Sequence, residues 1–285
     1  MGGRSGKSFS NSPTSTSPFR CVQPNYNQFN DYSMNKRLKL GLTLFFIGLL
    51  GVLTLLSVTI PLDSLPKEVL EKISPQTLKF LVLINPTILL LVAVVIGTIL
   101  YDKVGLSVPT ISSILKIKDS EIKFTDQIKF GVLFGLVTGI LTTITWLIFK
   151  SSIPQEFIDV GNKIKPTALA KFGYGGVTEE LLMRFGFMTL VVWIIFKVSK
   201  KLNDTTYWIG IILASILFGV GHFPVVFNVV KSPTTELLAY VLIGNSIAGL
   251  FFGWLYWKKG LEAAFIGHIF AHVAMIVGEQ VFQVQ

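Results

Sequence analysis

Long apolar runs, separated by short polar segments, occupy most of this chain. An α-helix needs about 20 consecutive, mainly apolar residues to cross the hydrocarbon core of a bilayer. By that measure the pattern predicts seven membrane-spanning helices, at about residues 40–60, 80–100, 127–149, 168–198, 207–222, 237–257 and 261–277. We therefore expect an all-α fold, a polytopic transmembrane bundle of about seven to eight helices.

Proline and glycine modify some of these runs. Asn85-Pro86, near the start of the second run, predicts a kink there. The fourth run is long for a single span, and a break is expected at its glycine-rich stretch, residues 173–176. The third run carries glycines at four-residue spacing, where another helix can approach closely. These are Gly131, Gly135 and Gly139. The connection that contains Pro154 and Pro166 is expected to be a loop.

The N-terminal segment has a different composition from the rest of the chain. Residues 1–35 are rich in Ser, Asn, Gln, Gly and Pro and contain almost no aliphatic side chains. Such a segment cannot bury enough apolar surface to fold, so we expect a disordered polar tail. This polar stretch precedes the first apolar run, which argues against a signal peptide. The remaining residues, 36–285, are expected to form one membrane helical domain.

Composition and charge agree with a membrane location. Hydrophobic residues make up 51% of the chain and charged residues only 14%, whereas soluble domains carry about 25% charged residues. The net charge of +9 is therefore read as lysine and arginine near helix ends and anionic headgroups, not as a nucleic-acid-binding surface. The expected partner is the lipid bilayer. Cys21, the single cysteine, can form no intrachain disulfide.

Basic residues also suggest an orientation. Most of them alternate onto one side of the predicted bundle: Lys36, Arg37, Lys39, the lysines of 103–123, Lys200, Lys201, Lys258 and Lys259. The positive-inside rule makes that side cytoplasmic, with the N-terminal tail inside. Three further lysines fall on the opposite side and reduce the difference in positive charge between the two sides. They are Lys150, Lys163 and Lys165.

A few ionisable residues interrupt the apolar runs. Glu179, Glu180 and Arg184 lie in the fourth run, and the chain's three histidines lie in the later runs, at His222, His268 and His272. Charges at membrane depth are costly, so they are expected to face a protein interior and to serve a function. On a helix, Glu180 and Arg184 lie one turn apart and can pair, while Glu179 points about 100° away from Glu180. One carboxylate can thus be held by Arg184 while the other stays available for acid–base chemistry.

The order of these residues resembles the CAAX protease and bacteriocin-processing (CPBP, or Abi) family of intramembrane proteases. The resemblance covers about residues 168–278 and rests on three motifs: Glu-Glu-x-x-x-Arg, Phe-x-x-x-His, and a histidine followed four residues later by another polar residue. It implies an intramembrane endopeptidase that hydrolyses a peptide bond of a membrane-associated protein or peptide, as CAAX prenyl proteases do. The sequence leaves open which substrate is cut and whether it is prenylated.

The resemblance also implies a role for each residue. Glu179 would activate the attacking water, and His222 would hold that water. His268 would stabilise the oxyanion with help from His272, at a position where the family usually has Asn or Asp. An imidazole can still donate a hydrogen bond there. Glu180 and Arg184 would support the site.

Two alternatives stay open at this level. His268 and His272 are spaced like a zinc-binding pair, and His222 with Glu179 could complete the ligand set. The glutamate that directly follows the first histidine in His-Glu-x-x-His enzymes is missing, because Ile269 stands there. The sequence is therefore compatible with a glutamate-type or a metallo-type protease. The other alternative is a different function: a non-catalytic scaffold or bacteriocin-immunity protein of the same fold or, less favoured, a proton-coupled transporter or haem protein.

Overall fold

The computed structural model describes residues 34–59, 72–118, 120–164 and 166–282, and within these ranges every regular element is helical. The all-α prediction is therefore confirmed for this part of the chain. Most of the tail predicted to be disordered, residues 1–33, lies outside the described residues. The first helix already begins at Met34.

Seven helical segments are long and apolar enough to cross a membrane, as the sequence predicted. They are α1 (Met34–Leu53) with η2 (Thr54–Ser57), α3 (Pro75–Leu81) with α4 (Ile84–Leu100), α6 (Phe124–Phe149) with η5 (Lys150–Ser152), the Ala168–Ser199 helix, α10 (Asp204–Val220) with α11 (Phe223–Val229), α12 (Thr235–Lys259), and α13 (Leu261–Val281). Side chains on their outer faces are apolar and exposed, among them Phe46, Ile88, Leu91, Ile212 and Ile216. Exposed apolar surface of this extent suits a lipid environment. The chain is an integral, multi-pass membrane protein.

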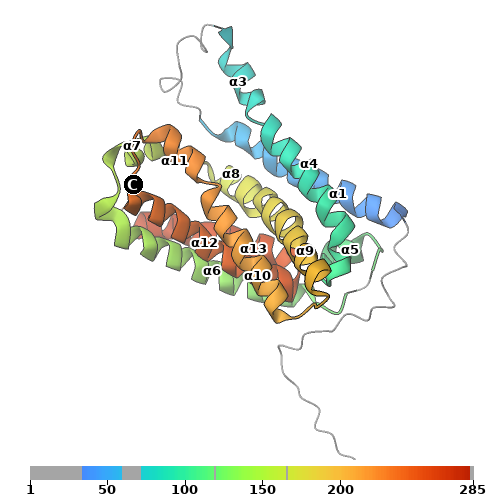
Figure 1. Ribbon diagram of the computed structural model, residues 1–285. Coiled ribbons are helices and arrows are strands. Elements are labelled where there is room, and N and C mark those ends of the chain that lie inside the picture. Colours follow the sequence, from blue (N-terminus) through green and yellow to red (C-terminus); the bar gives the residue numbers. More distant parts are fainter. Residues whose placement is uncertain (1–33, 60–71, 119, 165, 283–285) are drawn as a thin grey trace, which may run out of the picture.

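Short helices lie in the connections between these spans. The segment after α4 contains η4 (Asp102–Val104) and α5 (Pro109–Ile114). The connection predicted to be a loop between Pro154 and Pro166 contains a helix, α7 (Gln155–Lys163), so that part of the prediction was wrong. α7 and α11 lie at the end of the bundle where the C-terminal end of the chain also lies (Figure 1). Residues of α7 line a cavity that is described below.

The second span is interrupted just before Asn85-Pro86. The helix stops at Leu81 and resumes at Ile84, so Pro86 falls within the first turn of α4. Proline is tolerated there because the first backbone N–H groups of a helix have no intrahelical acceptor. In place of the predicted kink at Asn85-Pro86, the helix has a short irregular turn at Val82 and Leu83, whose backbone angles stay in the right-handed helical region.

The Ala168–Ser199 segment carries the two glutamates and is continuous. It consists of α8 (Ala168–Ala170), two π-helical stretches, η6 (Lys171–Glu179) and η7 (Leu181–Met188), and α9 (Thr189–Ser199). The break expected at 173–176 was wrong, because these glycines serve close packing. A Cβ on Gly173 would lie 2.5 Å from Thr54 of η2, and one on Gly176 would lie 2.5 Å from Ile269 of α13. Wide π turns are rare and often occur at functional sites.

The glycines of the third span pack against the last helix, as their spacing predicted. A Cβ on Gly135 would lie 2.3 Å from the carbonyl oxygen of Gly267, and one on Gly139 would lie 2.4 Å from that of Ala271. α6 therefore runs directly against the backbone of α13, which also packs against η6. This arrangement fixes the position of the histidines on α13.

Candidate active site

Three helical segments bring the ionisable residues together. Glu179 ends η6, while Glu180 and Arg184 continue into η7. His222 lies between α10 and α11, at the N-cap of α11, and His268 and His272 lie one turn apart on α13. α13 packs against η6, and α10 packs against η7. In Figure 1, α10 and α13 lie beside the helix that ends in α9.

Glu180 joins two of these segments. Its side chain is fully buried, and its Oε2 lies 3.1 Å from Nε of Arg184. The other carboxylate oxygen, Oε1, lies 2.8 Å from Nδ1 of His268. Since a carboxylate accepts hydrogen bonds, the Nδ1–H of His268 donates to Glu180. Glu180 therefore orients the His268 ring, and Arg184 in turn holds Glu180 in place.

Arg184 is enclosed by aromatic rings. Its guanidinium carbon lies 5.0 Å from the ring centre of Phe218 and 5.4 Å from that of Phe252. Its Nη2 donates a long hydrogen bond, 3.5 Å, to the carbonyl oxygen of Ala248. Together with the contact to Glu180, these interactions compensate the cost of burying the guanidinium group, which is only 1% exposed.

Glu179 lies on the other side of His268. Its Oε2 is 4.0 Å from Nε2 of His268, and 20% of its side chain is exposed. This separation suits one water molecule hydrogen-bonded to both atoms at about 2.8 Å. The His268 ring thus lies between one buried carboxylate and one accessible carboxylate.

The two histidines of α13 stack on each other. The ring centres of His268 and His272 are 4.9 Å apart, and His268 also stacks on Phe252 at 4.7 Å. A Cβ on Gly175 would lie only 2.7 Å from Nε2 of His272, so this position of η6 leaves room for the ring. Nδ1 of His272 is buried and has no hydrogen-bond partner among the described residues. A buried, unpaired nitrogen is costly, which makes it a candidate for binding a substrate group.

His222 is linked to this cluster through Phe218. Its Nδ1–H donates to the carbonyl oxygen of Phe218 at 2.7 Å. The Phe218 ring is edge-on to both His222, at 5.0 Å, and His268, at 6.2 Å. Because Nδ1 of a neutral His222 carries the proton, its Nε2 is left as an acceptor that can bind a water hydrogen.

The metal hypothesis can be tested on the same geometry. Within the described residues, no group of three or more His, Cys, Asp or Glu side chains is arranged to hold a metal ion. Ligand atoms about 2.1 Å from a tetrahedral zinc ion lie about 3.3 Å apart. The 4.0 Å between Glu179 and His268 is wider than that. This one distance suits a bridging water better than two ligands of a formed tetrahedral zinc site.

Some contacts of the site had no clear signal in the sequence. Phe252 and Gly175, which border the histidines, were not singled out. The ion pair between Lys171 and Glu279 was not anticipated either. Glu279 could have been noticed, because it lies seven residues after His272 in an apolar helix and so falls on the same face.

A comparison with protein families identifies this part of the chain. The family model described as "Rce1-like: Type II CAAX prenyl endopeptidase Rce1-like" matches residues 163–274. That range includes Glu179, Glu180, Arg184 and the three histidines. Comparisons with curated proteins and with solved structures give no match. Residues 163–274 are therefore similar to the type II CAAX prenyl endopeptidase domain of Rce1-like proteins, which agrees with the resemblance to the CPBP family.

Proposed function

We propose that this protein is an intramembrane endopeptidase that hydrolyses a peptide bond near the C-terminus of a prenylated, membrane-associated protein or peptide. The observation that carries the proposal is the position of His268. Its Nδ1 is bound by the buried Glu180 at 2.8 Å, and its Nε2 faces the accessible Glu179 at 4.0 Å. The substrate class follows from the description of the matched family, which names CAAX prenyl substrates.

The first step is attack by water. Glu179, the accessible carboxylate, takes one proton from a water molecule, and Nε2 of His222 accepts a hydrogen bond from the other hydrogen. The water oxygen forms a bond to the scissile carbonyl carbon, and the π electrons of the carbonyl move onto its oxygen. The result is a tetrahedral intermediate with one negative oxygen.

His268 and His272 then stabilise that oxyanion. Because Nδ1–H of His268 already donates to Glu180, a second donor at Nε2 requires the ring to carry both protons. Burying this charge is costly, and the carboxylate of Glu179, 4.0 Å from Nε2, partly offsets the cost. When the C–N bond breaks, its electron pair goes to nitrogen, which receives the proton held by Glu179. The products are a new carboxyl group and a new amine.

The direct test uses purified protein in proteoliposomes. The substrates are a farnesylated peptide that ends in a CAAX sequence and the same peptide without the lipid. We expect cleavage of the farnesylated peptide at one bond near its C-terminus, identified by mass spectrometry. The unlipidated peptide should be cut more slowly, because the lipid concentrates the substrate at the membrane. Absence of hydrolysis of both peptides by folded protein would contradict the proposal.

The same assay distinguishes the glutamate mechanism from the metal-dependent one. We expect hydrolysis to continue at an unchanged rate after dialysis against a strong zinc chelator, because the 4.0 Å gap between Glu179 and His268 suits water. Metal content is measured on the same sample. Loss of activity on chelation, with recovery on addition of zinc, would instead assign the water to a metal held among Glu179, His222, His268 and His272.

A further inference from the structure

A cavity lies beside the candidate active site, at the end of the bundle that α7 covers. Its volume is about 330 Å³, which is within the range of small-ligand pockets. The lining residues come from α6, α7, α12, α13 and the start of η6, with Pro166 from the connection between α7 and α8. They are Thr142, Thr143, Trp146, Phe157, Ile158, Gly161, Asn162, Pro166, Lys171, Tyr240, Met275 and Glu279.

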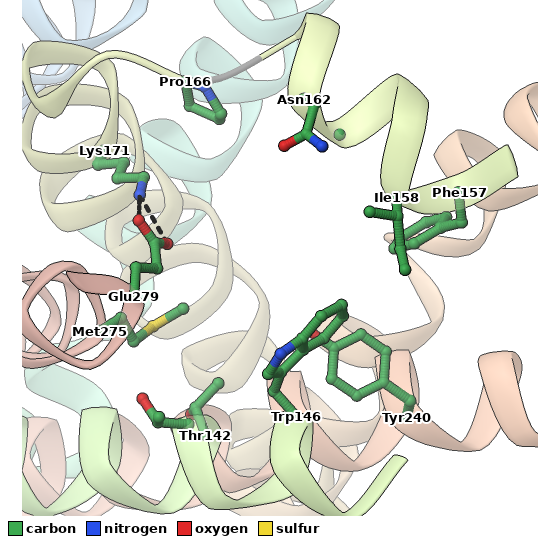
Figure 2. Close-up of a pocket in the computed structure, with 12 residues that line it drawn as sticks. Thr142, Trp146, Phe157, Ile158, Asn162, Pro166, Lys171, Tyr240, Met275 and Glu279 are labelled. Atoms are coloured by element: carbon green, nitrogen blue, oxygen red, sulfur yellow. Dashed lines mark hydrogen bonds and ion pairs between the residues drawn. The ribbon is translucent and has the colours of Figure 1, made fainter. Parts of the chain in front are cut away.

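One wall of this cavity carries an ion pair. Nζ of Lys171 lies 3.1 Å from Oε1 and 3.4 Å from Oε2 of Glu279. The side chain of Lys171 is 16% exposed and that of Glu279 is 43% exposed. Figure 2 shows the pair on one side of the cavity and Trp146, Tyr240 and Phe157 on the other. A mostly buried ammonium group is therefore held on the cavity wall by a carboxylate that solvent can reach.

The ion pair and the catalytic residues lie along the same helix contact. On η6, Lys171, Gly175 and Glu179 follow at four-residue spacing. On α13, a single face carries His268, His272, Met275 and Glu279. At the cavity, Lys171 contacts Glu279. In the middle of the helix contact, Gly175 lies against His272. At its other end, Glu179 faces His268. The closely packed contact between η6 and α13 thus extends from the cavity to the candidate active site.

The length of this helix contact is close to that of a short peptide lying along it. Eight residues separate Lys171 from Glu179, which is about 12 Å at the rise of an α-helix and less in wide π turns. Three residues of an extended peptide span about 10 Å. A substrate whose scissile carbonyl lies between Glu179 and His268 would therefore place a carboxylate near Lys171 if its chain ended three residues later.

We propose that Lys171 is a specificity-determining residue that binds the free C-terminal carboxylate of the substrate, three residues beyond the scissile bond. This inference rests on the proposed peptidase function. When no substrate is bound, the carboxylate of Glu279 pairs with the ammonium group of Lys171. The substrate carboxylate then replaces Glu279 in this ion pair. The unpaired Nδ1 of His272, between the two ends of the helix contact, is available to a peptide group of the leaving segment.

The experiment compares two farnesylated peptides that differ only at the C-terminus, one with a carboxylate and one with a carboxamide. In the wild-type protein, we expect the carboxamide to raise KM by about 10- to 100-fold, the loss typical of a hydrogen bond to a charged group. Lys171→Met should raise KM for the carboxylate peptide and remove the difference between the two peptides. Glu279→Gln should lower KM for the carboxylate peptide, because Lys171 is then unpaired.

The opposite responses of the two variants separate binding from structural support. An ion pair that only holds η6 to α13 predicts that both variants lose activity together and treat the two peptides alike. That result would overturn the inference, as would equal cleavage of both peptides by the wild type. If the wild type cleaves both peptides equally, the proposed peptidase function itself still stands. Cleavage of neither peptide by the wild type removes both proposals.

A cavity-filling variant tests the same inference without the ion pair. A Cβ on Gly161 would meet no atom within 4 Å, so Gly161→Trp can place its ring in the cavity with little strain. We expect it to raise KM for the carboxylate peptide at least several-fold. Glu156→Trp, on the same helix but outside the cavity lining, is the matched control and should leave KM near the wild-type value. Equal KM values for the two variants would contradict the inference.

Discussion

Glu179→Gln is expected to abolish hydrolysis, lowering kcat by about 1,000-fold or more, the upper part of the range for loss of a general base. Glutamine has the same shape but cannot take the proton of the attacking water. The fold should survive, because the side chain of Glu179 is 20% exposed and its nearest charged contact, to His268, is long at 4.0 Å. The measurement is kcat on the farnesylated peptide in proteoliposomes, with thermal unfolding of the same preparation.

Glu180→Gln is the matched comparison, since it makes the same chemical change at the next residue. Glu180 is fully buried and holds both Arg184 and His268. We therefore expect this variant to lose more stability than Glu179→Gln and to retain more activity. An active Glu179→Gln beside an inactive Glu180→Gln would reverse the two roles. In a biological assay, an unchanged phenotype of Glu179→Gln would favour the non-catalytic scaffold.

The second large effect is on stability. Arg184→Met should lower the free energy of unfolding by about 3–5 kcal/mol, because it leaves the buried carboxylate of Glu180 without its cationic partner. Methionine has a similar length and can pack between the rings of Phe218 and Phe252, so the loss reflects charge more than volume. The measurement is reversible unfolding in detergent micelles.

A double-mutant cycle isolates this charge effect. When Glu180→Gln is combined with Arg184→Met, both charges are absent, and the amide oxygen can still accept from His268. We expect the double variant to be more stable than Arg184→Met alone. If the two losses simply add, the pair does not act as a unit and the electrostatic explanation fails.

The number of spans could be predicted from the sequence because the hydrophobic length of a helix is a local property. The same holds for the pairing of Glu180 with Arg184, which are one turn apart on one helix. The family motifs also lie within short stretches, so the Glu-Glu segment and the histidines could be recognised as one set.

Glycine and proline were harder to interpret. The glycines at 173–176 were expected to break a helix, but they serve close contact with Thr54 and Ile269. Glycine permits both outcomes, and the neighbouring helix decides between them. α7 was missed because its connection was judged by its two flanking prolines, although Pro154 sits at the N-cap of that helix.

The sequence by itself determined that this protein is a bundle of membrane helices with a few ionisable residues at membrane depth. Only the tertiary structure decided which of these residues meet. Glu180 binds His268 across 88 residues of chain, and Lys171 binds Glu279 across 108. Hydropathy specifies how long each helix is but not which faces of two helices touch, since that depends on side-chain packing over the whole bundle. The cavity beside Lys171 follows from the same packing.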